Sequence, residues 1–189
     1  MRLTVTSTAL LQGLRDGDRS VWRLYVERYR PLIVGFGRRA GLADDDAEDF
    51  AQTTLLAFSR AYCEGRFDRE KGRLRSWLFG IARNTLRAHL RKPAPAGDGA
   101  SADALPAPDD IEALWDREWR EAILRDCMEQ LRREVRPETF EAFRRFALEE
   151  EPADEVARSL GTTPNAVYLA KKRLLARLRE LLPVMEDVW

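Results

Sequence analysis

Few side chains in this 189-residue sequence have the types and spacing that bond-breaking chemistry needs. The chain has one histidine, His89, and two cysteines, Cys63 and Cys127, which lie too far apart in the sequence to form a CxxC pair. It has no Gly-rich phosphate loop, no metal-ligand cluster and no pairing of a nucleophile with a base. Asp45 and Asp49 are close in sequence, but they open a predicted helix, where the helix dipole favours acidic side chains. We therefore expect no catalytic residue, no metal, no cofactor, and two reduced, partly buried thiols.

The chemistry that the sequence does favour is the binding of a polyanion. Lys+Arg and Asp+Glu both number 32, but the charge is distributed unevenly and two stretches are rich in basic residues. The first stretch carries Arg66, Arg69, Lys71, Arg73, Arg75, Arg83, Arg87, Arg91 and Lys92. The second lies in the last predicted helix and carries Lys171, Lys172, Arg173, Arg177 and Arg179. Two separate basic patches predict contact with nucleic acid at two places.

Within the first basic stretch, Arg83, Arg87 and Arg91 stand four residues apart and so form one stripe along a predicted helix. Aromatic residues near this stripe, among them Phe67 and Trp77, could stack on unpaired bases while the arginines follow the phosphates. A second interpretation places Trp77 in the protein core, because it shares the apolar face of its helix with leucine and isoleucine residues.

The elements that must position these residues are predicted to be helices throughout, because no segment alternates apolar and polar residues over the length of a strand. The exception is residues 93–110, where four prolines and several small residues predict a flexible linker. We therefore predict an all-α protein with two small helical domains, residues 1–92 and 111–189. The predicted helices cover residues 20–40, 45–62, 74–91, 111–134, 137–149, 153–160 and 164–182.

Helical spacing also predicts how two of these helices begin and pack. Asp44 is placed to cap the helix at 45–62. The core face of that helix is predicted to contain Ala47, Phe50, Ala51, Thr54 and Phe58. The core face of the helix at 74–91 is predicted to contain Leu74, Trp77, Leu78, Ile81 and Ala82.

Residues 152–171 have the pattern of a helix-turn-helix. This motif needs a small residue where its two helices cross, favours glycine in the turn and needs an apolar residue to seat the second helix. Ala157, Gly161 and Val167 meet these three needs. The sequence therefore predicts a helix-turn-helix in the C-terminal domain.

The second helix of this motif is predicted to begin after a Thr163 cap, with Pro164 at its first position, where the missing N–H costs nothing. Winding it at about 100° per residue clusters one apolar side: Val167, Ala170, Leu174, Leu178 and Leu181. The opposite side contains Asn165, Tyr168, Leu169, Lys172 and Ala176. Arg173 lies between the two sides, within reach of phosphates or a base edge. An amphipathic helix with a solvated basic face remains the alternative.

Three stretches in this order resemble the extracytoplasmic-function (ECF) sigma factors. Residues 45–61, with the sequence DDAEDFAQTTLLAFSRA, resemble the acidic helix of region 2.2. Residues 67–92 resemble regions 2.3 and 2.4, with a Trp-Leu-x-x-Ile-Ala-x-Asn signature that starts at Trp77 and ends at Asn84. The helix-turn-helix resembles region 4.2. Together the resemblance covers residues 15–92 and 115–182, and three motifs in this order are more specific than any one of them.

The resemblance implies a DNA-binding subunit that gives promoter specificity to bacterial core RNA polymerase. Docking on the clamp helices of the β′ subunit is then expected for Asp45, Asp46, Glu48, Asp49 and Gln52. Opening and reading of the −10 element, with one base flipped out, is expected for Phe67, Lys71, Arg73, Arg83, Asn84 and Arg87. Reading of the −35 element is expected for Asn165, Tyr168, Lys172 and Arg173. The β flap of polymerase and an anti-sigma factor are further expected partners.

Two departures from the family pattern bear on these expectations. Thr53 follows Gln52 where Gln-Glu is frequent in the family, and Tyr168-Leu169 stand where Arg or Lys-Ser is frequent. The second departure leaves the −35 sequence unpredicted, because Leu169 could meet a thymine methyl or pack on a neighbour.

Two other classes of protein remain as alternatives. A stand-alone helix-turn-helix regulator would explain residues 152–180 but not the acidic helix. A protein-binding adaptor built on a sigma scaffold would leave the basic stripes unexplained.

The sequence also bears on where the protein works. No apolar run is long enough to cross a membrane. The segment Met1–Leu14 lacks the pattern of a signal peptide. We therefore expect a cytoplasmic protein without membrane insertion.

Overall fold

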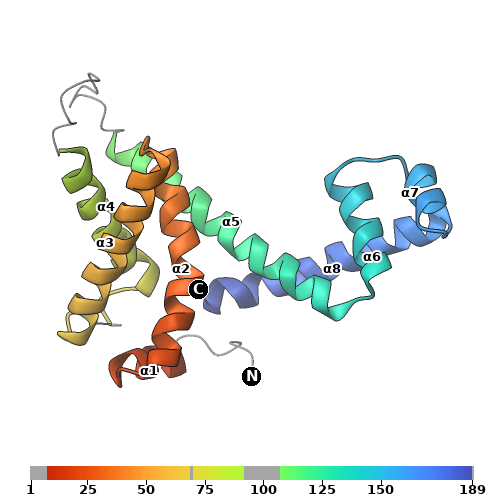
Figure 1. The fold of residues 1–189 in the computed structure, drawn as a ribbon. Helices are drawn as coiled ribbons and strands as arrows, with labels where there is room; N and C mark the ends of the chain where they lie inside the picture. Colours follow the sequence, from red (N-terminus) through yellow and green to blue (C-terminus); the bar gives the residue numbers. More distant parts are fainter. Residues whose placement is uncertain (1–7, 69, 92–106, 189) are drawn as a thin grey trace. The chain divides into compact units, whose positions relative to one another are not determined.

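The regular elements of the chain are all helical within the part that the structure describes (Figure 1). The structure is a computed structural model and describes residues 8–68, 70–91 and 107–188. The helices form two compact units, of which the first extends to Arg120 and the second runs from Glu121 to Val188. The prediction of an all-α fold is confirmed. Residues 93–106 of the predicted linker fall outside the described residues.

The first unit contains four complete helices among its described residues and the first part of a fifth. These are α1 Thr8–Arg15, α2 Arg19–Arg39, α3 Asp44–Cys63, α4 Leu74–Leu90 and the beginning of α5 Pro108–Glu134. The helices predicted before the linker are confirmed as α2, α3 and α4, and α1 is an additional element. The first residues of α5 come from the end of the predicted linker, where Asp109 and Asp110 suit the first turn of a helix.

The beginnings of α2 and α3 differ in how they are capped. The Asp18 carboxylate accepts a hydrogen bond from the Ser20 backbone N–H at 2.8 Å, as expected of an N-cap. The prediction that Asp44 caps α3 is wrong, because α3 already begins at Asp44 and Ala43 occupies the cap position. The Asp44 carboxylate instead pairs with Nε of Arg38, at a distance of 2.9 Å, because the end of α2 brings a positive charge close to it.

An aromatic core holds α2, α3 and α4 together. Tyr25 stacks on Phe58 with 4.4 Å between ring centroids, and Trp77 lies 5.0 Å from Phe58. The predicted core face of α3 is buried at every position: Ala47, Phe50, Ala51, Thr54 and Phe58. On α4, Leu78 and Ala82 are buried as predicted, whereas the other three predicted positions are half-buried. Full burial of a large apolar side chain is worth about 1.5–3 kcal/mol, so this core is a main source of stability in the unit.

The first part of α5 packs against the first unit. Trp115 is 1% exposed and contacts Phe36 edge-on, with 5.3 Å between the ring centroids. Trp119 is 3% exposed and lies 5.9 Å from Tyr29, and the Arg75 guanidinium lies 5.3 Å from its ring centroid. The sequence pattern predicts that this whole helix belongs to the second domain. Periodicity shows that a helix has an apolar face, but it does not show which element covers that face.

A buried carboxylate fixes the position of α5 on α2. Glu118 is 4% exposed and forms an ion pair with Arg39. A Cβ atom at Gly35 would lie 2.3 Å from Oε2 of Glu118, so α2 leaves room for the carboxylate only because this residue is glycine. A second ion pair joins Asp116 to Arg75 of α4. Since an unpaired buried charge costs several kcal/mol, Arg39 and the gap at Gly35 determine the register of α5.

The second unit contains the rest of α5, then α6 Pro137–Phe143, the π-helical segment η1 Arg144–Leu148, α7 Ala153–Ser159 and α8 Pro164–Val188. The helices predicted at 137–149, 153–160 and 164–182 are therefore present, and α8 continues past Pro183. One core cluster joins α6, α7 and α8: Ala142, Ala153, Val156, Ala157, Val167 and Ala170. These small and branched side chains let the helices approach closely.

Arg145 fixes the connection between η1 and α7. Its guanidinium donates to both carboxylate oxygens of Glu151, with 2.8 Å between Nε and Oε1, and to the Ser159 hydroxyl at 2.9 Å. These bonds hold the pKa of Glu151 below its usual value. The connection includes Glu150 at a φ of 57°, a left-handed conformation that costs a non-glycine residue about 1–2 kcal/mol. The bonds of Arg145 offset this strain and set the start of α7.

We expect Gly35→Ala to destabilise the first unit by about 1–3 kcal/mol, because the new Cβ would push Glu118 away from Arg39. Gly80 is the matched control, since it also lies inside a helix and a Cβ there meets no atom within 4 Å. Gly80→Ala should stabilise the unit by about 0.5–1 kcal/mol. Denaturant unfolding followed by tryptophan fluorescence reports on this unit, because residues 121–188 contain no tryptophan. Equal stability of the two variants would contradict the packing of α5.

Candidate functional site

The exposed face of α3 is acidic. It carries four of the five side chains predicted to bind polymerase: Asp45, Asp46, Asp49 and Gln52. Leu56, 52% exposed, continues this face by one further turn. Glu48 lies apart from the other four, because it is half-buried and pairs with Arg30 of α2 at 2.6 Å. The structure therefore groups four predicted residues in one surface and directs the fifth toward α2.

The loop between α3 and α4 holds Phe67 against the aromatic core. The ring of Phe67 stacks on Tyr62, with 6.0 Å between centroids and 26° between planes, and lies 5.1 Å from Trp77. Phe67 and Trp77 are both half-buried. The interpretation of Trp77 as a core residue is confirmed by its contacts with Phe58, Tyr62 and Phe67. Phe67 keeps an exposed part while its position is fixed by these rings.

The same loop presents two exposed cations. The Lys71 ammonium lies 3.1 Å from the Asp68 carboxylate, which also accepts a hydrogen bond from the Glu70 backbone N–H at 2.9 Å. The bonds to Glu70 and Lys71 lower the pKa of Asp68. Arg73 is exposed at the position just before α4. This local pairing gives the loop a defined shape while both cations stay accessible to solvent.

The arginine stripe of α4 is turned to solvent only in part. Asn84 and Arg91 are exposed and Arg87 is half-buried. Arg83 is half-buried as well, with its guanidinium carbon 5.7 Å from the centroid of the Phe79 ring. The Nε atom of Arg83 is buried and has no hydrogen-bond partner within the described ranges. The outward face of α4 is therefore centred on Asn84 and Arg87, with Arg83 at its edge.

The beginning of α8 has the local structure that the helix-turn-helix pattern predicts. Gly161, in the turn after α7, has a φ of 63°, a conformation that glycine adopts without strain. The Thr163 hydroxyl accepts a hydrogen bond from the Ala166 backbone N–H at 3.3 Å, and Pro164 is the first residue of α8. Val167 is completely buried in the core cluster of the unit. The turn, the cap and the seating residue are thus all at the predicted positions.

The outward face of α8 presents all four residues predicted to read the −35 element. Exposed positions on this face are Asn165, Tyr168, Leu169, Lys172, Arg173 and Ala176. The predicted inner face is buried at Val167, Ala170, Leu174 and Leu181 and half-buried at Leu178. Tyr168 is braced from the side by Phe146 of η1, with 5.1 Å between centroids and 89° between ring planes. Helical winding therefore predicted the two faces of α8 correctly.

The two cysteines lie in different surroundings. Cys127 is buried, which raises the pKa of its thiol to about 11. Cys63 is exposed, so the expectation of partial burial is wrong for this thiol.

No group of three or more His, Cys, Asp or Glu side chains in the described ranges could hold a metal ion. None of the described helices is both long and apolar enough to span a bilayer.

Comparison with known proteins decides the family. The family model of sigma-70 region 2 matches residues 25–94. The ECF RNA polymerase sigma factor RpoE of Cereibacter sphaeroides is 27% identical over 171 residues, which cover 88% of this chain and 91% of RpoE. The ECF RNA polymerase sigma factor SigD of Mycobacterium tuberculosis is 28% identical over 173 residues, which cover 87% of this chain and 78% of SigD. The chain belongs to the ECF sigma factors.

As an ECF sigma factor, the chain binds core RNA polymerase and promoter DNA and directs the initiation of transcription. The region 2 match extends over most of α2 and all of α3 and α4, and so includes the acidic face and the loop before α4. Among solved structures, that of CnrH in complex with the cytosolic domain of CnrY aligns with 93% of this chain and 96% of the solved chain. The identity is 21% and the TM-score is 0.39.

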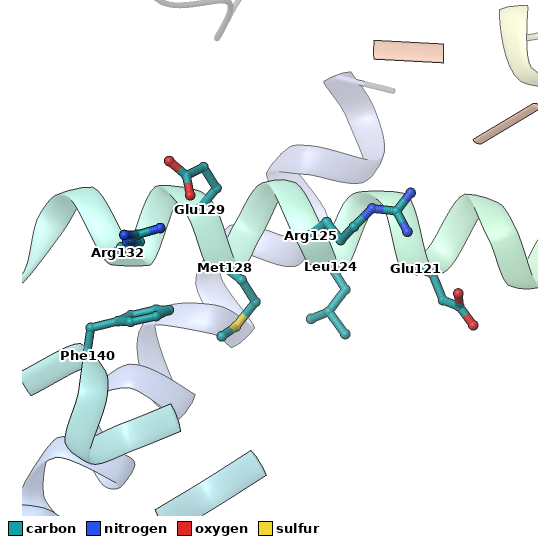
Figure 2. A pocket seen from close by; sticks show the side chains of 7 residues that line it. All are labelled: Glu121, Leu124, Arg125, Met128, Glu129, Arg132 and Phe140. Atoms are coloured by element: carbon teal, nitrogen blue, oxygen red, sulfur yellow. The ribbon is translucent and has the colours of Figure 1, made fainter. Parts of the chain in front are cut away.

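Sequence reasoning missed one surface of this sigma factor. An open groove of about 440 Å³ in the second unit is lined by Glu121, Leu124, Arg125, Met128, Glu129, Arg132 and Phe140. Figure 2 shows Leu124 and Met128 projecting from one side of α5, on the side where Phe140 of α6 lies. Leu124 is 43% exposed. The spacing of Leu124 and Met128 was a signal in the sequence, but only the position of α6 reveals that they line a groove.

We expect Thr163→Ala to destabilise the start of α8 by about 1 kcal/mol, because it removes the side-chain acceptor for the Ala166 N–H. Thr162→Ala is the control, since Thr162 is also exposed and its backbone N–H, which the substitution leaves in place, donates to the Ala157 carbonyl. Hydrogen exchange of a peptide that covers residues 160–170 should rise about fivefold in the first variant only. Equal exchange in both variants would show that Thr163 is not a functional cap.

Proposed function

We propose that this sigma factor uses separate surfaces for polymerase and for the two promoter elements. Acidic residues gather on the exposed face of α3 in the first unit, and basic residues gather on the exposed face of α8 in the second. DNA phosphates attract the face of α8 and repel the face of α3, so one ligand does not suit both. This separation of charge is the observation that carries the proposal.

The acidic face of α3 is the proposed contact with the clamp helices of the polymerase β′ subunit. Asp45 and Asp49 supply charge and Gln52 supplies both a hydrogen-bond donor and an acceptor. The exposed Leu56 adds an apolar contact at the end of the same stripe. Charge at such a surface increases the association rate and selects the partner, while the apolar contact adds affinity.

The groove of the second unit is the proposed contact with the β flap. It combines apolar side chains at Leu124, Met128 and Phe140 with charged residues of both signs. An amphipathic helix binds to such a groove with its apolar side inward and its charged residues at the rim. A protein that covered this groove or the face of α3 would compete with polymerase, and we propose an anti-sigma factor of that kind, acting in the cytoplasm.

The loop before α4 and the outward face of α4 are the proposed reader of the −10 element. Flipping one base out of the duplex costs a few kcal/mol. The exposed part of Phe67 offers a surface for stacking, and the exposed Lys71 and Arg73 stand in the same loop to contact phosphates. Asn84 and Arg87 extend this surface along α4, with Arg83 at its edge.

The N-terminal half of α8 is the proposed reader of the −35 element. Recognition helices contact base edges with their first turns, and here these turns present Asn165 and Tyr168. Lys172 and Arg173 follow one turn later, where they reach phosphates or a guanine edge. The capped start at Thr163 leaves backbone N–H groups near the DNA surface, which also favours phosphate.

Co-purification with bacterial core polymerase, followed by run-off transcription, tests the proposal as a whole. Stoichiometric binding and new start sites are expected, and the start sites define the −10 and −35 sequences. Specific binding to duplex DNA without polymerase, together with failure to bind polymerase, would instead support a stand-alone regulator.

We expect Asp49→Arg to weaken binding to core polymerase by at least about tenfold, because it reverses a charge in the middle of the acidic face. Glu112→Arg is the matched control, since Glu112 is an exposed acidic residue on another helix of the same unit. Fluorescence anisotropy of labelled sigma factor titrated with core polymerase measures both affinities. Equal weakening by the two variants would mean that net charge, and not the face of α3, governs binding.

We expect Arg173→Ala to reduce promoter binding by the holoenzyme about tenfold while binding to core polymerase stays unchanged. Arg179→Ala is the control, because Arg179 is an exposed arginine of α8 beyond the turns that reach base edges. Promoter affinity is measured by competition at fixed salt, since phosphate contacts are sensitive to ionic strength. Loss of polymerase binding in Arg173→Ala would contradict the division between the two surfaces.

A further inference from the structure

An apolar side chain stands at the centre of the exposed face of α8. Leu169 is 42% exposed, although it lies between residues that form hydrogen bonds or carry charge. Asn165 precedes it by four residues and Arg173 follows it by four, so all three lie in one row along the helix. A single exposed leucine is ordinary on a protein surface, but its place in this row is specific.

Leu169 is not needed to hold α8 in the second unit. The core cluster receives Val167 and Ala170 from this part of α8, and Leu174 is buried one turn later. Leu169 points to the other side, where it stays accessible to a ligand. The sequence leaves two roles for Leu169, contact with DNA or packing on a neighbouring side chain. Its exposure favours contact with DNA.

The neighbouring Tyr168 is held in place beside Leu169. Tyr168 is 55% exposed, and its ring rests edge-on against Phe146, whose ring centroid also lies 4.7 Å from the Lys171 ammonium. A ring fixed in this way loses little conformational entropy on binding. Tyr168 and Leu169 therefore form a small, preformed apolar surface next to the polar ends of Asn165 and Lys172.

The major groove of DNA offers one apolar group to such a surface. Base edges there present hydrogen-bond donors and acceptors, and thymine alone adds a C5-methyl group. Side chains four residues apart on a helix lie about 5–6 Å apart, and base pairs are stacked about 3.4 Å apart. Leu169 and Asn165 would therefore read positions about one or two base pairs apart.

We propose that Leu169 is a specificity-determining residue that contacts the C5-methyl group of a thymine in the −35 element, with Tyr168 closing the apolar contact. The proposal rests on the assignment of α8 to the −35 element. It predicts a thymine at the centre of the contacted sequence, about one or two base pairs from a base pair that Asn165 reads by hydrogen bonding.

The test uses holoenzyme and a promoter found by run-off transcription. Each thymine of the −35 element is replaced in turn by deoxyuridine, which removes the methyl group and keeps every hydrogen-bonding atom. At one or two positions the native holoenzyme should bind about fourfold more weakly, the effect expected for one buried methyl group. Leu169→Ala should bind the thymine promoter more weakly by a similar factor and show no further loss with deoxyuridine.

The control is Val184→Ala, which truncates another exposed apolar residue of α8 far from its N-terminal turns. It should keep the full response to deoxyuridine. Leu169→Ala is expected to fold, because the residue is exposed and alanine has the highest helix propensity.

Two negative results are distinguishable. If base-pair changes in the −35 element alter binding but deoxyuridine has no effect, or affects the native protein and Leu169→Ala equally, the proposal for Leu169 is overturned. If no change in the −35 element alters binding, the assignment of α8 to that element fails as well.

Discussion

The Glu118 carboxylate sets how the first unit is assembled, because a charge removed from water needs both a partner and room. Arg39 is the partner, and the absence of a side chain at Gly35 provides the room. The tryptophan rings at 115 and 119 pack beside this pair and supply the apolar burial. A buried ion pair adds little net stability once desolvation is counted, but it penalises every other register of α5 on α2. The stability therefore comes from the rings and the register from the charges.

This assembly also determines which charges remain available to ligands. Arg39 and Arg75 are engaged by carboxylates of α5, whereas Lys71 and Arg73 in the loop before α4 and Arg91 just after α4 stay exposed. Glu48 is engaged by Arg30 in the same way. The carboxylates left at the exposed face of α3 then form an acidic surface that is distinct from the basic ones. A chain with zero formal net charge can thus present surfaces of opposite sign.

The aromatic residues at the proposed −10 surface contribute both to the fold and to the proposed site. Phe67 belongs to the same cluster as Trp77 and Tyr62, so the loop is anchored to the core of the unit. A loop held in this way is preorganised, and less conformational entropy is lost when it binds an unpaired base. In the second unit, Phe146 does the same for Tyr168 on the outward face of α8.

The sequence by itself determined the features that depend on neighbours along the chain. The helices, the glycine turn at 161, the cap at Thr163 and the two faces of α8 follow from local backbone preferences and from a period of 3.6 residues, and all are present. The order of three motifs was sufficient to indicate the ECF sigma family, which the comparisons confirm.

Only the tertiary structure decided which elements meet. It placed the first part of α5 on α2, turned Glu48 toward Arg30 and drew Arg83 against Phe79. It also created the groove beside Met128. Periodicity identifies an apolar or charged face but carries no information about the partner of that face. The partner is chosen by contacts between residues far apart in the sequence, because apolar surface must be buried and buried charges must be paired in the same arrangement.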